Sequence, residues 1–69
     1  MIAVFKTNIK YQEDANFALQ ELNKHYSACK VTLDLEDCDK VLRIEGTGFT
    51  IKSIIKVISD LGYYCEELE

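Results

Sequence analysis

Apolar residues recur along this 69-residue chain at spacings that change from one segment to the next. Between Gln12 and about His25 they follow the i, i+3, i+4, i+7 spacing of one helical face, which predicts an amphipathic helix. Glu13 and Asp14 in its first turn and Lys24 in its last turn suit the helix dipole, which indicates the direction and the ends. The apolar positions are Ala15, Ala18, Leu19 and Leu22.

A second helix is predicted over residues 51–61, where isoleucines recur at helical spacing. Thr50 is placed as its N-cap, since a threonine hydroxyl accepts a hydrogen bond from a free backbone N–H of the first turn. Phe49 and Ile54 have the spacing of a hydrophobic staple, and Gly62 follows as a C′ residue able to adopt positive φ. The predicted buried stripe is Ile51, Ile54, Ile55, Ile58 and Leu61.

The remaining apolar segments predict β-strands. Residues 2–9 carry β-branched and aromatic side chains on both parities, so the pattern leaves the buried face of this strand open. Residues 30–35 alternate polar and apolar positions, and residues 40–45 return after a turn at residues 36–39. The last strand is expected at residues 63–68. The inner parity of the two middle strands carries Val31, Leu33, Leu35, Leu42 and Ile44.

Strand–helix–strand repeated twice with short connections predicts an α+β fold, the ferredoxin-like βαββαβ sandwich. Its four-stranded antiparallel sheet has the order 4-1-3-2, and both helices cover one face. In this topology the loop after the first strand, the turn at residues 36–39 and the Gly62-Tyr63 corner lie at one end of the domain.

The length of the chain and its net charge exclude several classes of function. The chain is expected to form a single domain, residues 1–69. Its net charge of −4 argues against nucleic acid and against an anionic membrane surface, because both require a basic footprint. No apolar run approaches the roughly 20 residues of a membrane span, and no signal-peptide core precedes Lys6, so a cytoplasmic location is expected.

Three cysteines are scattered along the chain without a Cys-x-x-Cys pair, and an odd, widely spaced set favours reduced thiols over a disulfide framework. Cys29 and Cys65 lie beside or within predicted strands and are expected to be buried as small apolar residues. Cys38 lies in a turn and is expected to be exposed. The sequence contains no Ser-His-Asp or Cys-His arrangement and no glycine-rich phosphate loop. We therefore expect neither an enzyme nor a cofactor.

Three stretches have counterparts in a known family: Thr7-Asn8-Ile9-Lys10 before the first loop, the hairpin of residues 31–44, and Gly62-Tyr63 ahead of an acidic tail. Together they resemble the heavy-metal-associated (HMA) domain, the small module of copper and mercury chaperones and of metal-pumping ATPases. In that family the first loop carries Cys-x-x-Cys, and its two thiolates hold the metal. Aligned without gaps, the two cysteine positions fall on Tyr11 and Asp14.

The chemistry of these two positions differs from that of the family. Soft or borderline ions such as Cu(I), Hg(II) and Zn(II) favour a pair of thiolates at a helix N-terminus. Tyr11 offers a phenol that keeps its proton at neutral pH, and Asp14 offers a hard oxygen donor. Glu13 and Asp14 cannot supply the roughly six oxygens that Mg²⁺ or Ca²⁺ needs. We expect no metal here, with Tyr11 packed over the end of the core.

The resemblance implies an HMA-like domain that has lost thiolate metal binding and acts as a protein-interaction or regulatory module. HMA domains dock through charged surfaces at the metal-loop end, so the expected partner is a protein with a basic docking face, and the chain a monomer or weak dimer. The expected loop-end surface comprises Ile9, Lys10, Glu13, Cys38 and Tyr63.

Two other functions stay open. One is a heavy-metal binding or transport protein with non-standard ligands, and the other is a small-ligand sensor that pairs its sheets in a dimer. The non-standard ligands would come from Tyr11, Glu13 and Asp14 together with Cys38 or Cys65.

Overall fold

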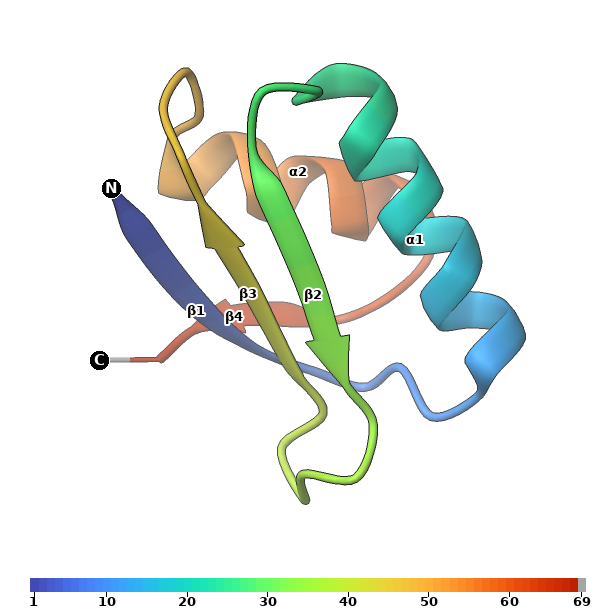
Figure 1. The fold of residues 1–69 in the computed structure, drawn as a ribbon. Coiled ribbons are helices and arrows are strands. Elements are labelled where there is room, and N and C mark those ends of the chain that lie inside the picture. The colour runs from blue at the N-terminus through green and yellow to red at the C-terminus, as the bar shows by residue number, and fades with distance from the viewer. Residues whose placement is uncertain (69) are drawn as a thin grey trace.

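A four-stranded antiparallel sheet with two helices on one face makes up the computed structural model, which describes residues 1–68 (Figure 1). The strand order β4-β1-β3-β2 confirms the predicted ferredoxin-like topology. No helix in residues 1–68 has the length and apolar character needed to cross a membrane. The elements are β1 (Ile2–Thr7), α1 (Gln12–His25), β2 (Lys30–Asp34), β3 (Val41–Glu45), α2 (Ile51–Asp60) and β4 (Cys65–Glu67).

The structure shows which face of the central strand β1 is buried, which the sequence pattern left open. Ala3, Phe5 and Thr7 face the core, whereas the alternate positions face away from the helices. The strand ends at Thr7, two residues earlier than predicted, because Ile9 leaves the ladder and its N–H donates to the Thr7 hydroxyl at 3.3 Å. The Ile9 side chain nevertheless stays buried. β4 is also shorter than predicted, at Cys65–Glu67.

Both helices begin and end where their sequences indicate. Thr50 caps α2 through its hydroxyl, which accepts from the Ser53 N–H at 3.0 Å, and the Ser53 hydroxyl accepts from the Thr50 N–H in return. This reciprocal capping box adds a partner that the sequence pattern alone had not identified. At the other end Gly62, with φ of +96°, forms a Schellman motif in which the Tyr63 N–H donates to the Ile58 carbonyl.

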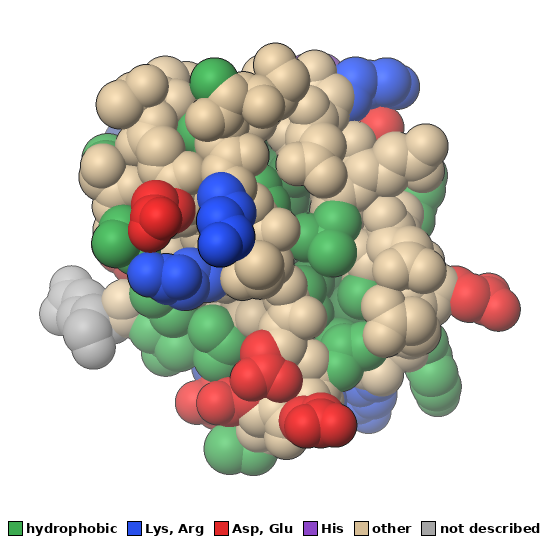
Figure 2. All heavy atoms as spheres, viewed as in Figure 1, with side chains coloured by type: hydrophobic (Ala, Val, Ile, Leu, Met, Phe, Trp, Pro, Cys, Tyr) green, Lys and Arg blue, Asp and Glu red, His purple; other side chains and the backbone are tan. Residues whose placement is uncertain are grey.

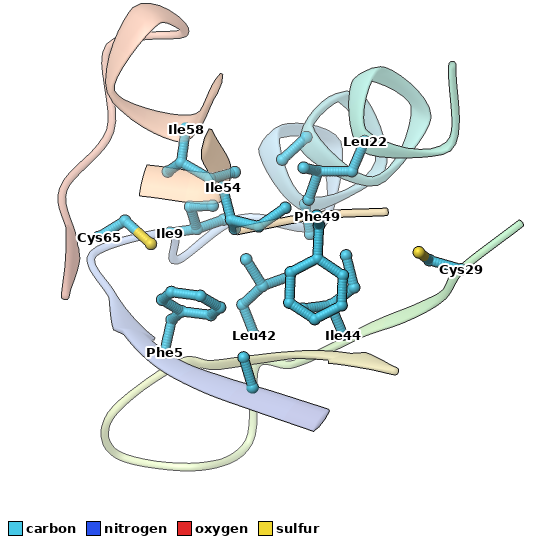
Figure 3. Packing of buried hydrophobic residues seen from close by; sticks show 13 residues of the cluster. Phe5, Ile9, Leu22, Cys29, Leu42, Ile44, Phe49, Ile54, Ile58 and Cys65 are labelled. Atoms are coloured by element: carbon cyan, nitrogen blue, oxygen red, sulfur yellow. The ribbon is translucent and has the colours of Figure 1, made fainter. Parts of the chain in front are cut away.

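The core lies between the helices and the sheet (Figure 3). Phe5, Leu42 and Ile44 rise from the sheet toward side chains of both helices, and none of them is exposed to solvent. The predicted helical stripes are buried along their centres only, since their outer members lie half-exposed at the rim. The buried helical members are Ala15, Ala18, Leu22, Ile54 and Ile58, and the rim members are Leu19, Ile51, Ile55 and Leu61.

Candidate functional site

The loop after β1 and the turn between β2 and β3 meet at one end of the domain, as the topology predicted (Figure 1). Thr7 joins them through two hydrogen bonds, because its N–H donates to the Asp39 carbonyl at 3.1 Å and its hydroxyl donates to the Lys40 carbonyl at 2.6 Å. Lys40 has φ of +49° and its ammonium group donates to the Leu35 carbonyl, which closes the turn on itself. Thr7 is thus a buried polar anchor between the two loops.

The corner between α2 and β4 is tied to the same end by two side chains. The Tyr63 hydroxyl donates to the Asp14 carboxylate at 2.7 Å, and the Tyr64 N–H donates to the Asn8 side-chain oxygen at 2.8 Å. The hydrogen bond to Asp14 stabilises the protonated phenol and raises the pKa of Tyr63 above its usual value. Asp14 therefore links α1 to a corner 49 residues away in the sequence. Its negative charge also lies in the first turn of α1, where the helix dipole favours it.

Tyr11 does not pack over the end of the core, and this prediction was wrong. Its side chain is 69% exposed, whereas the nearby Ile9 is buried. Tyr11 is the N-cap of α1, with extended backbone and no side-chain hydrogen bond to the first turn. A shallow hollow runs along this first turn, lined by Tyr11, Gln12, Glu13 and Asp14.

The turn between β2 and β3 carries exposed acidic groups, as expected, and Figure 2 shows acidic side chains gathered at the lower end of the molecule. Two of them shape the turn, because Asp34 accepts from the Glu36 N–H at 3.0 Å and Asp37 accepts from the Asp39 N–H at 2.8 Å. The exposed Cys38 thiol lies among them. Ligand atoms of Asp37, Cys38 and Asp39 lie within 4.8 Å of one another.

The other two thiols are buried at opposite sides of the core (Figure 3). Burial raises the pKa of Cys65 to about 12, so this thiol stays protonated at neutral pH and is a poor metal ligand. The Cys29 thiol donates to the Thr47 carbonyl at 3.1 Å. Both cysteines therefore have the packing role that the sequence predicted.

Within residues 1–68, Glu13 and Asp14 do not form a three-ligand group with Cys38 or Cys65. Among the described residues, Asp37, Cys38 and Asp39 form a three-residue group of Cys, His or acidic ligands within 4.8 Å, and this group contains neither Glu13 nor Asp14. Asp14 is instead engaged by Tyr63. Of the expected loop-end surface, Lys10, Glu13 and Cys38 are exposed, Tyr63 is half-buried and Ile9 is buried.

Several contacts at this end could not be predicted from the sequence, among them the Asn8–Tyr64 and Asp14–Tyr63 hydrogen bonds. Their partners are 56 and 49 residues apart along the chain. The turn propensity of Asn and the helix-start preference of Asp were visible, but neither property indicates a distant tyrosine. Tertiary structure alone supplies these pairings.

Comparison with known structures found a chain with the same architecture. The chain is similar to the solution structure of the yeast copper transporter domain Ccc2a, determined in its apo and Cu(I)-loaded states. The two share 18% sequence identity, with a TM-score of 0.76, and the match covers 99% of this chain and 94% of that one. At this identity the likeness concerns the fold, and it confirms the HMA-like fold that the sequence predicted. No protein-family profile and no curated protein matches the chain.

Proposed function

We propose that this HMA-like domain has lost thiolate metal binding and acts as a protein-interaction or regulatory module. The observation that carries the proposal is the chemistry of the two positions that align with the family's cysteines. Tyr11 there is an exposed phenol, and the carboxylate of Asp14 already accepts a hydrogen bond from Tyr63. A phenol and a hard carboxylate are ligands against which Cu(I) discriminates.

The same end of the domain supports a docking role. Glu13, Glu36 and Asp37 are exposed there, and Asp39 is half-buried beside them. With a net charge of −4 on the chain, the field at this end favours a partner that presents lysine or arginine. A protein with a basic docking face fits this surface.

The first test is competition with a strong Cu(I) chelator. Wild-type protein is expected to leave the ion with the chelator, whereas the double variant Tyr11→Cys with Asp14→Cys is expected to bind it. Position 11 is the N-cap of α1 and position 14 lies in its first turn, so two thiols there share one helix N-terminus, where the dipole favours thiolates. The matched control is Tyr11→Ser with Asp14→Ser, which removes the same side chains without adding sulfur.

The outcomes distinguish an interaction module without thiolate metal binding from a metal-binding protein with non-standard ligands. Tight Cu(I) binding by the wild type that is lost in Cys38→Ser would establish metal binding through non-standard ligands and contradict the proposal. Failure of the double-cysteine variant to bind would instead show that the loop does not have the shape of a family metal loop. Spectroscopic titration of the displaced chelator gives both answers.

A second test probes docking with a lysine-rich peptide, followed by amide chemical shifts of labelled protein. We expect shifts confined to residues 8–14 and 36–40, reduced by added salt, and absent with a serine-rich peptide of equal length. Asp37→Asn with Asp39→Asn should weaken binding while keeping the turn, because an asparagine oxygen at position 37 still accepts the hydrogen bond from the backbone N–H of residue 39. Glu45→Gln, at the opposite end of β3, is the control. Shifts spread evenly over the surface would count against a docking site.

A further inference from the structure

The edge strand β2 has one unpaired side. It pairs with β3 through all five of its residues and, among the strands of the described residues, borders none on its other side. Within residues 1–68 no backbone hydrogen bond of Lys30–Asp34 lies outside that ladder. The outer N–H and C=O groups of the strand are therefore available to another extended chain.

We propose that this edge binds the β2 strand of a second copy of the chain, in antiparallel orientation, about a two-fold axis at Thr32. The sequence Lys-Val-Thr-Leu-Asp is complementary to itself in this register. Lys30 faces Asp34 of the second copy, Val31 faces Leu33, and Thr32 faces its own equivalent. The product is one eight-stranded sheet with a symmetric, closed interface.

The charges of the strand select this register. Lys30 and Asp34 are exposed, and neither takes part in an ion pair within the described residues. However, Lys30 lies opposite Glu45 of β3, and the Asp34 carboxylate accepts from the Glu36 N–H. Antiparallel pairing centred on Thr32 creates two Lys30–Asp34 pairs between the two copies. It also pairs all five residues of each strand. Parallel pairing in register would place like charges side by side, and a shift by two residues would remove both Lys30–Asp34 pairs. Opposite-charge cross-strand pairs stabilise a sheet, and like pairs destabilise it.

Apolar side chains continue the core across the proposed boundary. Val31 and Leu33 are half-buried and face the helical side of the sheet. A two-fold axis perpendicular to the sheet keeps both α1 helices on that side, so these residues meet their counterparts beneath two helices. Figure 2 shows hydrophobic side chains between the surface formed by β2 and that formed by α1. Pairing would remove this apolar rim from water.

Charged side chains on edge strands often prevent self-association, through repulsion between like charges and through the loss of hydration on burial. Here the residue opposite each charge carries the opposite sign, so self-pairing brings attraction. The acidic turns of the two copies, residues 36–39, follow β2 and therefore lie at opposite ends of the interface. Their repulsion is consequently small, because a separation of several strand residues exceeds the screening length in physiological salt.

The test measures the dimer by sedimentation at concentrations from micromolar to millimolar. We expect a concentration-dependent dimer of the wild type, weakened about tenfold by Lys30→Asp or by Asp34→Lys, since each change creates two like-charge pairs. The double reversal should restore the wild-type affinity. Mixing the two single variants should give a heterodimer tighter than either homodimer, because both cross-strand pairs of the homodimers are repulsive. Circular dichroism melts check that each variant stays folded.

Cross-linking tests the position of the axis. In a Cys38→Ser background, Thr32→Cys should form an intermolecular disulfide under mild oxidation, since directly opposed residues have Cα atoms about 4.5–5.5 Å apart. Lys30→Cys in the same background should not, because each copy of residue 30 faces residue 34. A wild type that stays monomeric at millimolar concentration, a double reversal as weak as the single variants, or equal cross-linking at both positions would overturn the proposed pairing.

Discussion

Replacing Ile54 or Ile58 with alanine is expected to lower the free energy of unfolding by about 2–5 kcal/mol. Both side chains have no exposed surface and lie where α2 meets the sheet. Truncation removes buried methylene groups and leaves a cavity that a 69-residue domain has little material to fill. Because small domains have a net stability of only about 5–15 kcal/mol, either change consumes a large share of it.

Denaturant unfolding followed by circular dichroism measures the effect. Lys56→Ala is the matched control on the solvent face of the same helix, where its ion pair with Asp60 is exposed and contributes little. Asp14→Ala should cost about 1 kcal/mol, since it removes one hydrogen bond to Tyr63 and a favourable dipole contact. A larger loss for Asp14→Ala than for Ile54→Ala would mean that the loop end, and not the α2–sheet interface, dominates stability.

Gly46→Ala is expected to cost about 2–4 kcal/mol, the second large effect. A β-carbon at this position would lie 2.9 Å from the Cys29 sulfur and 3.0 Å from its Cα atom, closer than van der Waals contact allows. The residue also has φ of +146°, which an L side chain adopts only with strain. Backbone and side chain of the segment before β2 would both have to shift.

Gly48→Ala separates the two causes, because Gly48 has φ of +86° but a β-carbon there would meet no atom within 4 Å. It should cost only the conformational strain, about 1–2 kcal/mol. Adding Cys29→Ala to Gly46→Ala should recover part of the loss by removing the sulfur contact while leaving the contact with Cα. Equal melting temperatures of Gly46→Ala and Gly48→Ala would show that the close approach of Cys29 is not a constraint.

The candidate site was predictable in place but not in detail. The topology alone put the first loop, the β2–β3 turn and the Gly62-Tyr63 corner at one end, because chain connections between adjacent elements leave few arrangements. The orientation of single side chains was not predictable. Tyr11 was expected to pack over the end of the core and is exposed, whereas Ile9 is buried. Which of two nearby apolar residues is buried depends on the backbone path out of β1.

Sequence by itself determined the order of the elements and the ends of both helices, because periodicity and capping are local. The isoleucine stripe of α2, the Thr50 cap and the Gly62 terminus depend on residues within a few positions of one another. The presence of Tyr11 and Asp14, with no cysteine between them, is likewise a property of one loop. Local chemistry therefore fixed the class of fold and excluded a two-thiolate site at this loop.

Only the tertiary structure decided which face of β1 is buried, how Thr7 joins two loops, and that Asp14 accepts a hydrogen bond from Tyr63. Each of these features depends on groups that lie tens of residues apart in the sequence. The residue type alone is compatible with several partners or positions in each case. Both parities of β1 are apolar, so burial there follows from the helices that cover one face. Long-range packing selects among alternatives that local sequence leaves equal in free energy.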